Sequence, residues 1–227
     1  MRINLWSMIA CGAVASAAAA GPEWTETPDA GNLPGSAQTP IDVFMVNDLT
    51  GIKGALSGGS PRGTGDFQDM YRVLIKDPEA FSAVITQNTS GNPSFNTMLW
   101  VFDELGRGVL GNDNATFSPV MNGSGMFNNS TDGTGVVITN PGIYYIAVSG
   151  AGSVPVDSNG TPIFEFAVPD EVSGPDGSLN PIAGWSGPGA IGEYTIQFSG
   201  VSFIPSPGAA GLFGLAGLTA SRRRRRA

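Results

Sequence analysis

The chain has no histidine and a single cysteine, and these two features exclude several kinds of chemistry. Without histidine there is no Ser-His-Asp or Cys-His catalysis, no imidazole metal ligand and no histidine pH switch. One cysteine cannot form a disulfide framework, a structural zinc site or an iron–sulfur cluster. Nothing else in the sequence points to a reaction, so we expect a protein that is not an enzyme.

Charged side chains are also scarce, at 13% of the 227 residues, and they are unevenly placed. All 19 acids lie between Glu23 and Glu193, whereas six of the 11 bases are Arg2 and the run Arg222 to Arg226. The part between these terminal bases therefore has five bases and a net charge of −14. Such a surface repels nucleic acid and favours cations, so no nucleic-acid partner is expected.

Residues 1–20 have the pattern of a secretory signal peptide. Arg2 precedes a short apolar run, and small residues lead to a predicted cleavage site after Ala20. A buried N-terminal helix is the alternative, but the Pro-, Gly- and Thr-rich residues after it could not continue that helix. A lipoprotein box ending at Cys11 is a further alternative, although the apolar run before it is short. The protein is thus predicted to be exported.

The C-terminal residues 205–227 carry a second signal: Pro205, Ser206 and Pro207, then an apolar stretch over 208–220, then a cluster of arginines. As a helix that stretch would span about 20 Å, short of the roughly 30 Å hydrocarbon core of a membrane. The cluster would stay cytoplasmic by the positive-inside rule. A plain tail anchor and an arginine tail for nucleic acid are alternatives, and export argues against the second. The residues expected to set the membrane topology are Arg222, Arg223, Arg224, Arg225 and Arg226.

This terminus resembles the PEP-CTERM sorting signal of bacterial exoproteins, with Ser206 where that motif has glutamate. The resemblance implies sorting to the cell envelope or extracellular matrix, transient or permanent anchoring in the membrane, and cleavage near the proline motif by an exosortase-type protease. Signal peptidase and that protease would be the partners during export.

Between the signals, the 33 glycines and 17 prolines of the chain leave no segment free of both that is longer than 12 residues. Helical bundles need longer segments, so an all-β fold is predicted, namely a single β-sandwich of jelly-roll type over residues 41–204. Residues 21–40 lack periodicity and are interpreted as a flexible leader. Alternating or continuous apolar patterns predict strands at 42–46, 52–56, 69–76, 81–86, 98–102, 135–139, 143–149 and 193–199.

One local signal differs from this pattern. Asp77 followed by Pro78 is typical of a helix start, and we expect a single turn there, with a short helix as the alternative.

Five short motifs follow one another in the order seen in bacterial pre-peptidase C-terminal (PPC-like) domains, at residues 66–71, 99–103, 111–113, 141–150 and 192–196. The chain is similar to that family over residues 66–203. The resemblance implies a small β-sandwich that accompanies secreted proteins, is sometimes stabilised by calcium and is not catalytic. The chain differs in its insert at 150–189 and in having no attached peptidase.

The acidic loops are the part of the predicted sandwich best suited to bind a metal ion. Asp69, Asp103 and Asp113 are the candidate calcium ligands, because carboxylates suit a hard cation that takes six to eight oxygens. Loops at one end of a sandwich could bring them together. Turn formation is the alternative, since Asp, Asn and Gly also serve that role.

Two tryptophans could contact a sugar ring. Trp100 lies in an apolar strand and is predicted to be core, whereas Trp185 lies in a loop and is the candidate ligand residue. A carbohydrate-binding module of the exopolysaccharide matrix is accordingly the alternative function. The main expectation is an exported structural or adhesive protein, with calcium as its one candidate cofactor.

Catalysis by carboxylates or by a Ser-Lys dyad is disfavoured. Asp103 and Glu104 would point to opposite faces of a strand, and neither Lys53 nor Lys76 lies in a known motif.

Overall fold

The structure is a computed structural model that describes residues 22–42, 47–59, 65–88, 95–120 and 122–205. This part of the chain is all β, with no helix, and within it no helix could cross a membrane. The predicted all-β class is confirmed.

The two terminal signals fall almost entirely outside the described residues, so their predicted roles stay predictions. Only Pro205 of the proline motif is described, at the end of the last strand. The signal residues that lie outside the described part are Ala20, Ser206, Pro207, Arg222, Arg223, Arg224, Arg225 and Arg226.

Five strands form one sheet, in the order β1-β3-β13-β5-β8. They are β1 (Glu23–Thr25), β3 (Gly51–Leu56), β13 (Gly192–Ser199), β5 (Ser82–Asn88) and β8 (Gly125–Phe127). β13 is antiparallel to both of its neighbours, and β1 pairs in parallel with β3. The leader thus supplies an edge strand of this sheet.

Six strands form the second sheet, in the order β11-β7-β6-β9-β4-β14. They are β11 (Val172–Ser173), β7 (Gly108–Asn112), β6 (Thr97–Phe102), β9 (Gly142–Gly150), β4 (Gln68–Ile75) and β14 (Val201–Ser202). Two small pairs join β10 (Pro155–Val156) to β12 (Gly184–Trp185), and β2 (Ile41–Asp42) to β15 (Ile204–Pro205).

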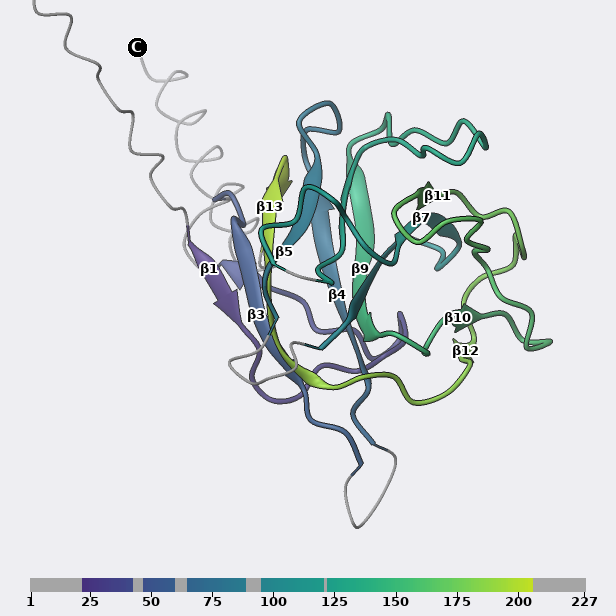
Figure 1. The fold of residues 1–227 in the computed structure, drawn as a ribbon. Coiled ribbons are helices and arrows are strands. Elements are labelled where there is room, and N and C mark those ends of the chain that lie inside the picture. Colours follow the sequence, from purple (N-terminus) through teal and green to yellow (C-terminus); the bar gives the residue numbers. More distant parts are fainter. Residues whose placement is uncertain (1–21, 43–46, 60–64, 89–94, 121, 206–227) are drawn as a thin grey trace, which may run out of the picture.

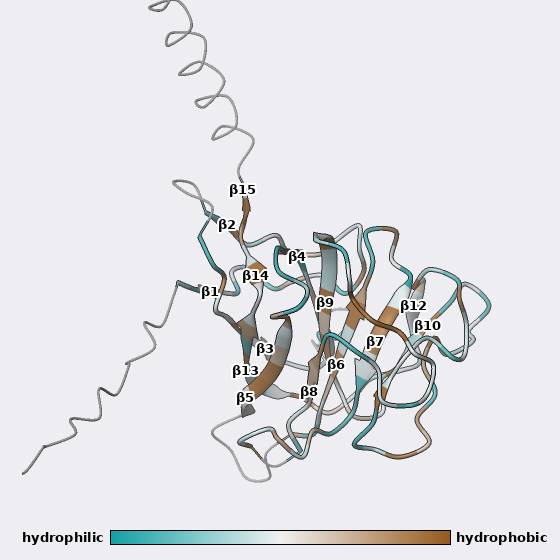
Figure 2. Ribbon diagram, turned by 90° about the horizontal axis from the view of Figure 1, so that it is seen from above, coloured by the Kyte–Doolittle hydropathy of each residue, from teal (hydrophilic) through white to brown (hydrophobic). Residues whose placement is uncertain are grey.

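The two large sheets share one apolar core, an arrangement consistent with a β-sandwich (Figures 1 and 2). Alternation within each strand determines which side chains enter it, because successive residues point to opposite faces. Tyr71 and Val73 of β4 thus meet Tyr194 and Ile196 of β13 in the same cluster. The alternating patterns of β4 and β13 correctly predicted these inward faces.

The insert at 150–189 covers the outer face of the six-stranded sheet (Figure 2). Trp100 and Phe102 of β6 point to this face and pack with Ile163 and Phe164 of the insert. β6 is therefore buried on both faces, as its unbroken apolar run predicted. Trp100 is 0% exposed, which confirms its assignment to the core.

Several boundaries differ from the sequence predictions. The strand expected at 135–139 is wrong, since Val137 makes only an isolated bridge to Asn129. Of the strand expected at 42–46, Asp42 ends β2 and the rest lies outside the described residues. The turn at Asp77 and Pro78 is confirmed: the Ala80 amide donates to the Asp77 carboxylate and the Phe81 amide to the Pro78 carbonyl, both at 3.3 Å.

Within the segment 21–40, which is interpreted from the sequence as a flexible leader, the part that the structure describes pairs with two other strands. Beyond β1, the Gln38 amide donates to the Met70 carbonyl at 2.9 Å, and the Arg72 amide donates to the Gln38 carbonyl at 2.8 Å. The leader therefore packs along β4. Its contacts come from pairing with distant strands, which requires no periodicity in its own sequence.

Candidate functional site

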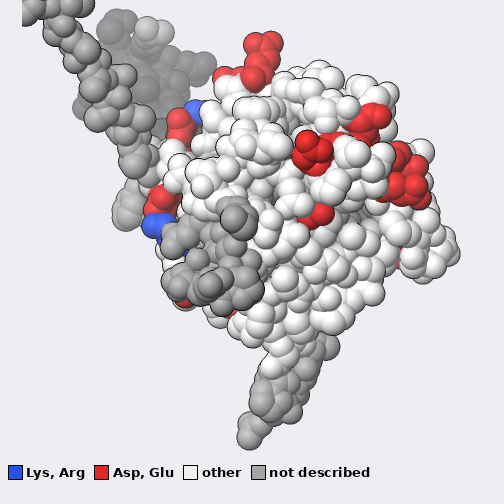
Figure 3. All heavy atoms as spheres, viewed as in Figure 1, with Lys and Arg blue, Asp and Glu red and all other residues white. Residues whose placement is uncertain are grey.

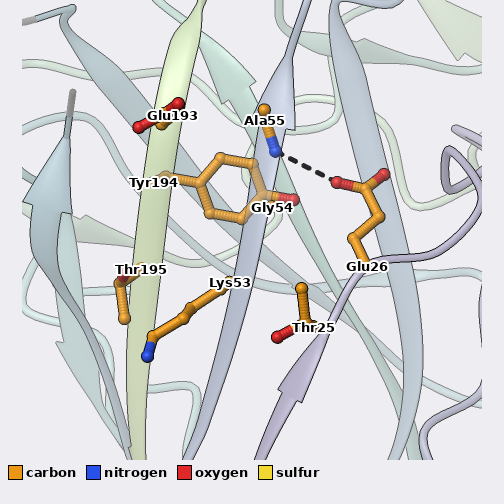
Figure 4. A pocket seen from close by; sticks show the side chains of 8 residues that line it. All are labelled: Thr25, Glu26, Lys53, Gly54, Ala55, Glu193, Tyr194 and Thr195. Carbon is orange, nitrogen blue, oxygen red and sulfur yellow. Dashed lines mark hydrogen bonds between the residues drawn. The ribbon is translucent and has the colours of Figure 1, made fainter. Parts of the chain in front are cut away.

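Glu26 follows β1 and is held rigidly beside β3. Its amide donates to the Lys53 carbonyl at 2.9 Å, which continues the pairing of β1. Its carboxylate accepts from the Ala55 amide at 3.0 Å and from the Ala30 amide at 2.6 Å (Figure 4). Two backbone donors thus fix a leader carboxylate at the edge of the five-stranded sheet.

Asp69 reaches the same place from β4. It shares the inward face of β4 with Tyr71 and is 0% exposed. Its Oδ2 accepts from the Tyr194 hydroxyl at 2.6 Å, and the Tyr194 and Tyr71 hydroxyls lie 2.6 Å apart. Its Oδ1 is buried and has no hydrogen-bond partner among the described residues. A buried carboxylate oxygen without a partner is costly, so a ligand for it must be sought.

Gly54 of β3 allows these groups to approach. A Cβ at this position would collide with the Tyr194 hydroxyl and with the Glu26 carboxylate. Figure 4 shows the Tyr194 ring from β13 directed past Gly54 toward the side where Glu26 lies, within a groove of about 460 Å³. The absence of a side chain on Gly54 therefore brings the leader carboxylate close to the end of the core.

Four carboxylates gather here, and we call Glu26, Asp29, Asp66 and Asp69 the acidic cluster. One carboxylate oxygen from each of Glu26, Asp29 and Asp69 lies within 4.8 Å of the others. Asp66 interacts with Asp29, and its Oδ2 accepts from the Ser57 amide at 2.6 Å. Within the part of the chain that the structure describes, the Oδ1 of Asp66 is buried without a partner, as is that of Asp69.

Burial and mutual repulsion disfavour the charged forms of these acids. Burial raises the pKa of Asp69 to about 9, and the Glu26 carboxylate adds to the rise. Burial also raises the pKa of Asp29, with Asp66 and Glu26 adding to it. The ion pairs found among the described residues are Lys53–Glu23 and Lys76–Asp48, neither of which reaches the cluster. The cluster therefore favours either a bound proton or a bound cation.

A hard divalent cation fits this donor set. All the candidate ligands are carboxylate oxygens, and calcium prefers such oxygens. Two of the oxygens are buried with no partner in the described ranges. A polar pocket of about 160 Å³, lined by Asp29 and Asp66 among others, adjoins the cluster and provides room for water ligands. Glu26, Asp29, Asp66 and Asp69 could thus hold calcium, with water completing the coordination.

The predicted calcium triad is not brought together, although Asp69 belongs to the acidic cluster. β6 and β7 are antiparallel, so Asp103 after β6 and Asp113 after β7 lie at opposite ends of that pair. Asp69 and Asp113 lie toward the same end, but β9 and β6 separate their strands. Three strand spacings of about 4.8 Å put them roughly 14 Å apart.

Asp103 instead closes its own turn, since its Oδ1 accepts from the amides of Leu105 and Arg107, both at 2.9 Å. Asp113 is half-buried, and burial raises its pKa. Its Oδ1 has no partner among the residues described. Asp103 therefore stabilises a turn, which is the alternative to metal binding considered for these loops.

Sequence reasoning missed Glu26 and Asp29, because both lie in the segment interpreted as a leader. A signal was present, since that segment carries three acids and no base. Their partners on β4 and β13 are distant in the chain, so only the tertiary structure reveals the cluster.

Trp185 is half-buried and ordered by its contacts. Its Nε1 donates to the Asn32 carbonyl at 2.8 Å, and its ring makes a T-shaped contact with Trp100, with centroids 6.3 Å apart. It lines a surface groove.

Of the other residues considered, Pro205 is exposed at the end of β15. Lys53 and Lys76, weighed as catalytic bases, form surface ion pairs with Glu23 and Asp48. Most acidic side chains on the face seen in Figure 3 lie over the side of β7 and β11, away from the leader.

Comparison with known proteins adds no assignment: no family model matches the chain, and no curated protein matches it.

Proposed function

We propose that the chain is an exported, non-enzymatic protein of the bacterial cell envelope or extracellular matrix, with a structural or adhesive role. Its fold is a β-sandwich of jelly-roll type. Calcium bound by the acidic cluster fastens the leader to the sandwich. The observation that carries this proposal is the convergence of Glu26, Asp29 and Asp69 within 4.8 Å, where Asp69 has a buried oxygen that no described residue pairs.

The position of these ligands supports a structural use of the metal. Glu26 and Asp29 belong to the leader, whereas Asp66 and Asp69 belong to the segment that begins β4. A cation between them joins two distant parts of the chain across the edge of the five-stranded sheet. Such a metal-mediated link would stabilise the folded protein outside the cell, where calcium is abundant. It needs no catalytic group.

The test is thermal unfolding of the full chain in excess calcium and in EDTA. A ligand present at about 100 times its Kd stabilises the native state by about 2.7 kcal/mol. For a domain of this size we expect calcium to raise the Tm by about 5–10 °C. Asp69→Asn and Glu26→Gln should lose this response.

The matched control is Asp103→Asn, which changes the same chemical group outside the acidic cluster and should keep the response. Equal Tm values in calcium and EDTA would overturn the calcium proposal. A calcium response that persists in both D69N and E26Q would show that the site is elsewhere.

Sorting is tested separately, by the intact mass of the protein recovered from the envelope and medium of its host. We expect a product that begins near Gly21 and ends between Pro205 and Gly208, after cleavage by signal peptidase and an exosortase-type protease. A product that keeps Arg222 to Arg226 would instead identify a membrane-tethered domain. It would refute processing at the proline motif.

A further inference from the structure

A second surface feature lies beside the acidic cluster. It is a shallow groove of about 380 Å³, a size within the range of roughly 300–1,000 Å³ typical of small-ligand sites. We call it the Trp185 groove. Its lining includes Leu33, Phe67, Gln68, Trp185, Gly187 and Pro188.

The aromatic wall of the groove is held in place before any ligand arrives. Trp185 is fixed by its hydrogen bond to the Asn32 carbonyl and by its T-shaped contact with Trp100. Gln68 is fixed as well, because its Nε2 donates to the Ser153 hydroxyl at 2.7 Å and to the Gly187 carbonyl at 3.1 Å. Preorganised side chains lose little conformational entropy on binding, which favours a ligand site over an incidental depression.

The charges around the groove restrict what it can bind. Among the described residues, no lysine or arginine lines it. The adjoining polar pocket shares Asn32, Gly65 and Gln68 with the groove and adds the carboxyl groups of Asp29 and Asp66. Even with one divalent cation bound, four ionised carboxylates leave the acidic cluster with a net charge of −2, so phosphate, sulfate and uronate groups would be repelled there. The ligand is therefore uncharged or cationic.

Beside the aromatic wall, the adjoining pocket contributes the carboxyl groups of Asp29 and Asp66, which only accept hydrogen bonds when they are ionised. A ligand that satisfies them must present many hydrogen-bond donors next to a flat apolar face. A pyranose ring does both, since its hydroxyls donate and its C–H face packs on an aromatic ring. A peptide strand offers about one backbone donor per residue and matches this acceptor-rich border less well.

We propose that the Trp185 groove binds a neutral polysaccharide chain, with a hexopyranose ring against Trp185 and its hydroxyls toward the acceptor-rich border. Phe67, Leu33 and Pro188 complete the apolar wall. This assignment rests on the adhesive role proposed above and deepens it, because it names the class of matrix polymer that the domain holds. Its contacts with Trp185 do not require calcium.

Gly187 offers a way to block the groove without disturbing the core. A Cβ added there meets no described atom within 4 Å, and its backbone is not in the left-handed region. Gly187→Leu should therefore fill part of the groove and leave the fold intact. Trp185→Ala removes the aromatic face directly. Phe127→Ala is the matched control, since Phe127 is a 52% exposed aromatic residue on β8, outside the groove.

The experiment is native affinity electrophoresis of the full chain through gels that contain a soluble β-glucan, a mannan, a dextran or alginate, with calcium and with EDTA. We expect retardation by at least one neutral polymer and none by the anionic alginate. Affinity should fall at least about tenfold in W185A and in G187L and stay unchanged in F127A.

The proposal is overturned if no neutral polymer retards the protein, or if W185A and G187L are retarded as strongly as the native chain. Binding of a polyproline peptide that G187L abolishes, with no glycan bound, would assign the groove to a peptide instead. If a neutral polymer still retards the protein in EDTA, and the Tm is the same in calcium and in EDTA, the calcium proposal is refuted and the polysaccharide proposal holds.

Discussion

The middle of the core between the two sheets is lined by aliphatic side chains, whereas its end beside the leader is lined by hydroxyls and carboxylates. Ile52, Ile85 and Ile196 pack in the middle and are 0% exposed. Tyr71 and Asp69 are equally buried at the end. These side chains of the two regions are equally buried, but the stability of the two regions responds to different conditions.

Aliphatic burial stabilises the fold through the hydrophobic effect, which depends little on pH or on calcium. A buried carboxylate is stabilising only when a proton, a donor or a cation compensates its charge. One continuous core thus contains a part whose stability is nearly independent of pH and calcium and a part whose stability depends on both. Two measurements separate these parts.

The largest expected effect is at the middle of the core. Ile196 lies on the central strand β13, opposite Ile52 on one side and Ile85 on the other. Replacing it with alanine leaves a cavity that the flanking strands cannot close, so Ile196→Ala should lower the free energy of unfolding by about 2–5 kcal/mol. Urea unfolding in calcium and in EDTA should give the same loss.

The control is Ile191→Ala, which removes the same atoms from a residue that is 48% exposed, and we expect a loss of less than about 0.5 kcal/mol. Ile196→Val, with an expected loss of about 0.5–1.5 kcal/mol, keeps the measurement possible if the alanine variant does not fold. A loss at Ile196 that depends on calcium would contradict the separation of the two parts.

The aliphatic middle is also the part that the sequence predicts well. β4 and β13 alternate over eight residues each, and this period of two assigns Tyr71, Val73, Tyr194 and Ile196 to the core without any tertiary information. β7 was missed because glycines occupy two of its five positions. The apolar run at 135–139 was predicted as a strand, but it makes only a short local pairing: the Val136 carbonyl accepts from the Ser130 amide and the Ile138 amide donates to the Asn128 carbonyl.

The acidic end could be predicted only in part. Asp69 was identified from its place at the start of β4. Its partners Glu26 and Asp29 are brought to it by the parallel pairing of β1 with β3, and that pairing leaves no periodic pattern in residues 23–25. Asp103 and Asp113 were grouped with Asp69 because loops of a sandwich can share one end. The antiparallel order of β6 and β7 places them at opposite ends, a consequence of topology rather than of residue type.

The smaller expected effect is a dependence of stability on pH that is confined to the acidic end. The pKa of Asp69 rises from its ordinary 3.8 to about 9 in the folded protein, chiefly through burial. The folded state therefore holds a proton that the unfolded state has released. Between about pH 4 and 9, stability in EDTA should fall as pH rises, by at most about 1.4 kcal/mol per pH unit for this one group.

Asp69→Asn keeps the shape of the side chain and cannot titrate, so its Tm in EDTA should vary less between pH 5 and 8 than that of the native chain. Glu26, Asp29 and Asp66 face Asp69 and remain in the variant, and the raised pKa of Asp29 leaves a weaker slope of the same sign. Tyr71 and Tyr194 stay neutral in this range, because burial raises the pKa of both.

Excess calcium should reverse the slope of the native chain, because the cation replaces the proton and binds more strongly as the carboxylates ionise. Thermal unfolding at four pH values, with calcium and with EDTA, measures both slopes. If the stability of the native chain in EDTA changes with pH no more than that of D69N, Asp69 is ionised without a cation. The end of the core would then behave like its aliphatic middle, and the contrast between the two regions would disappear.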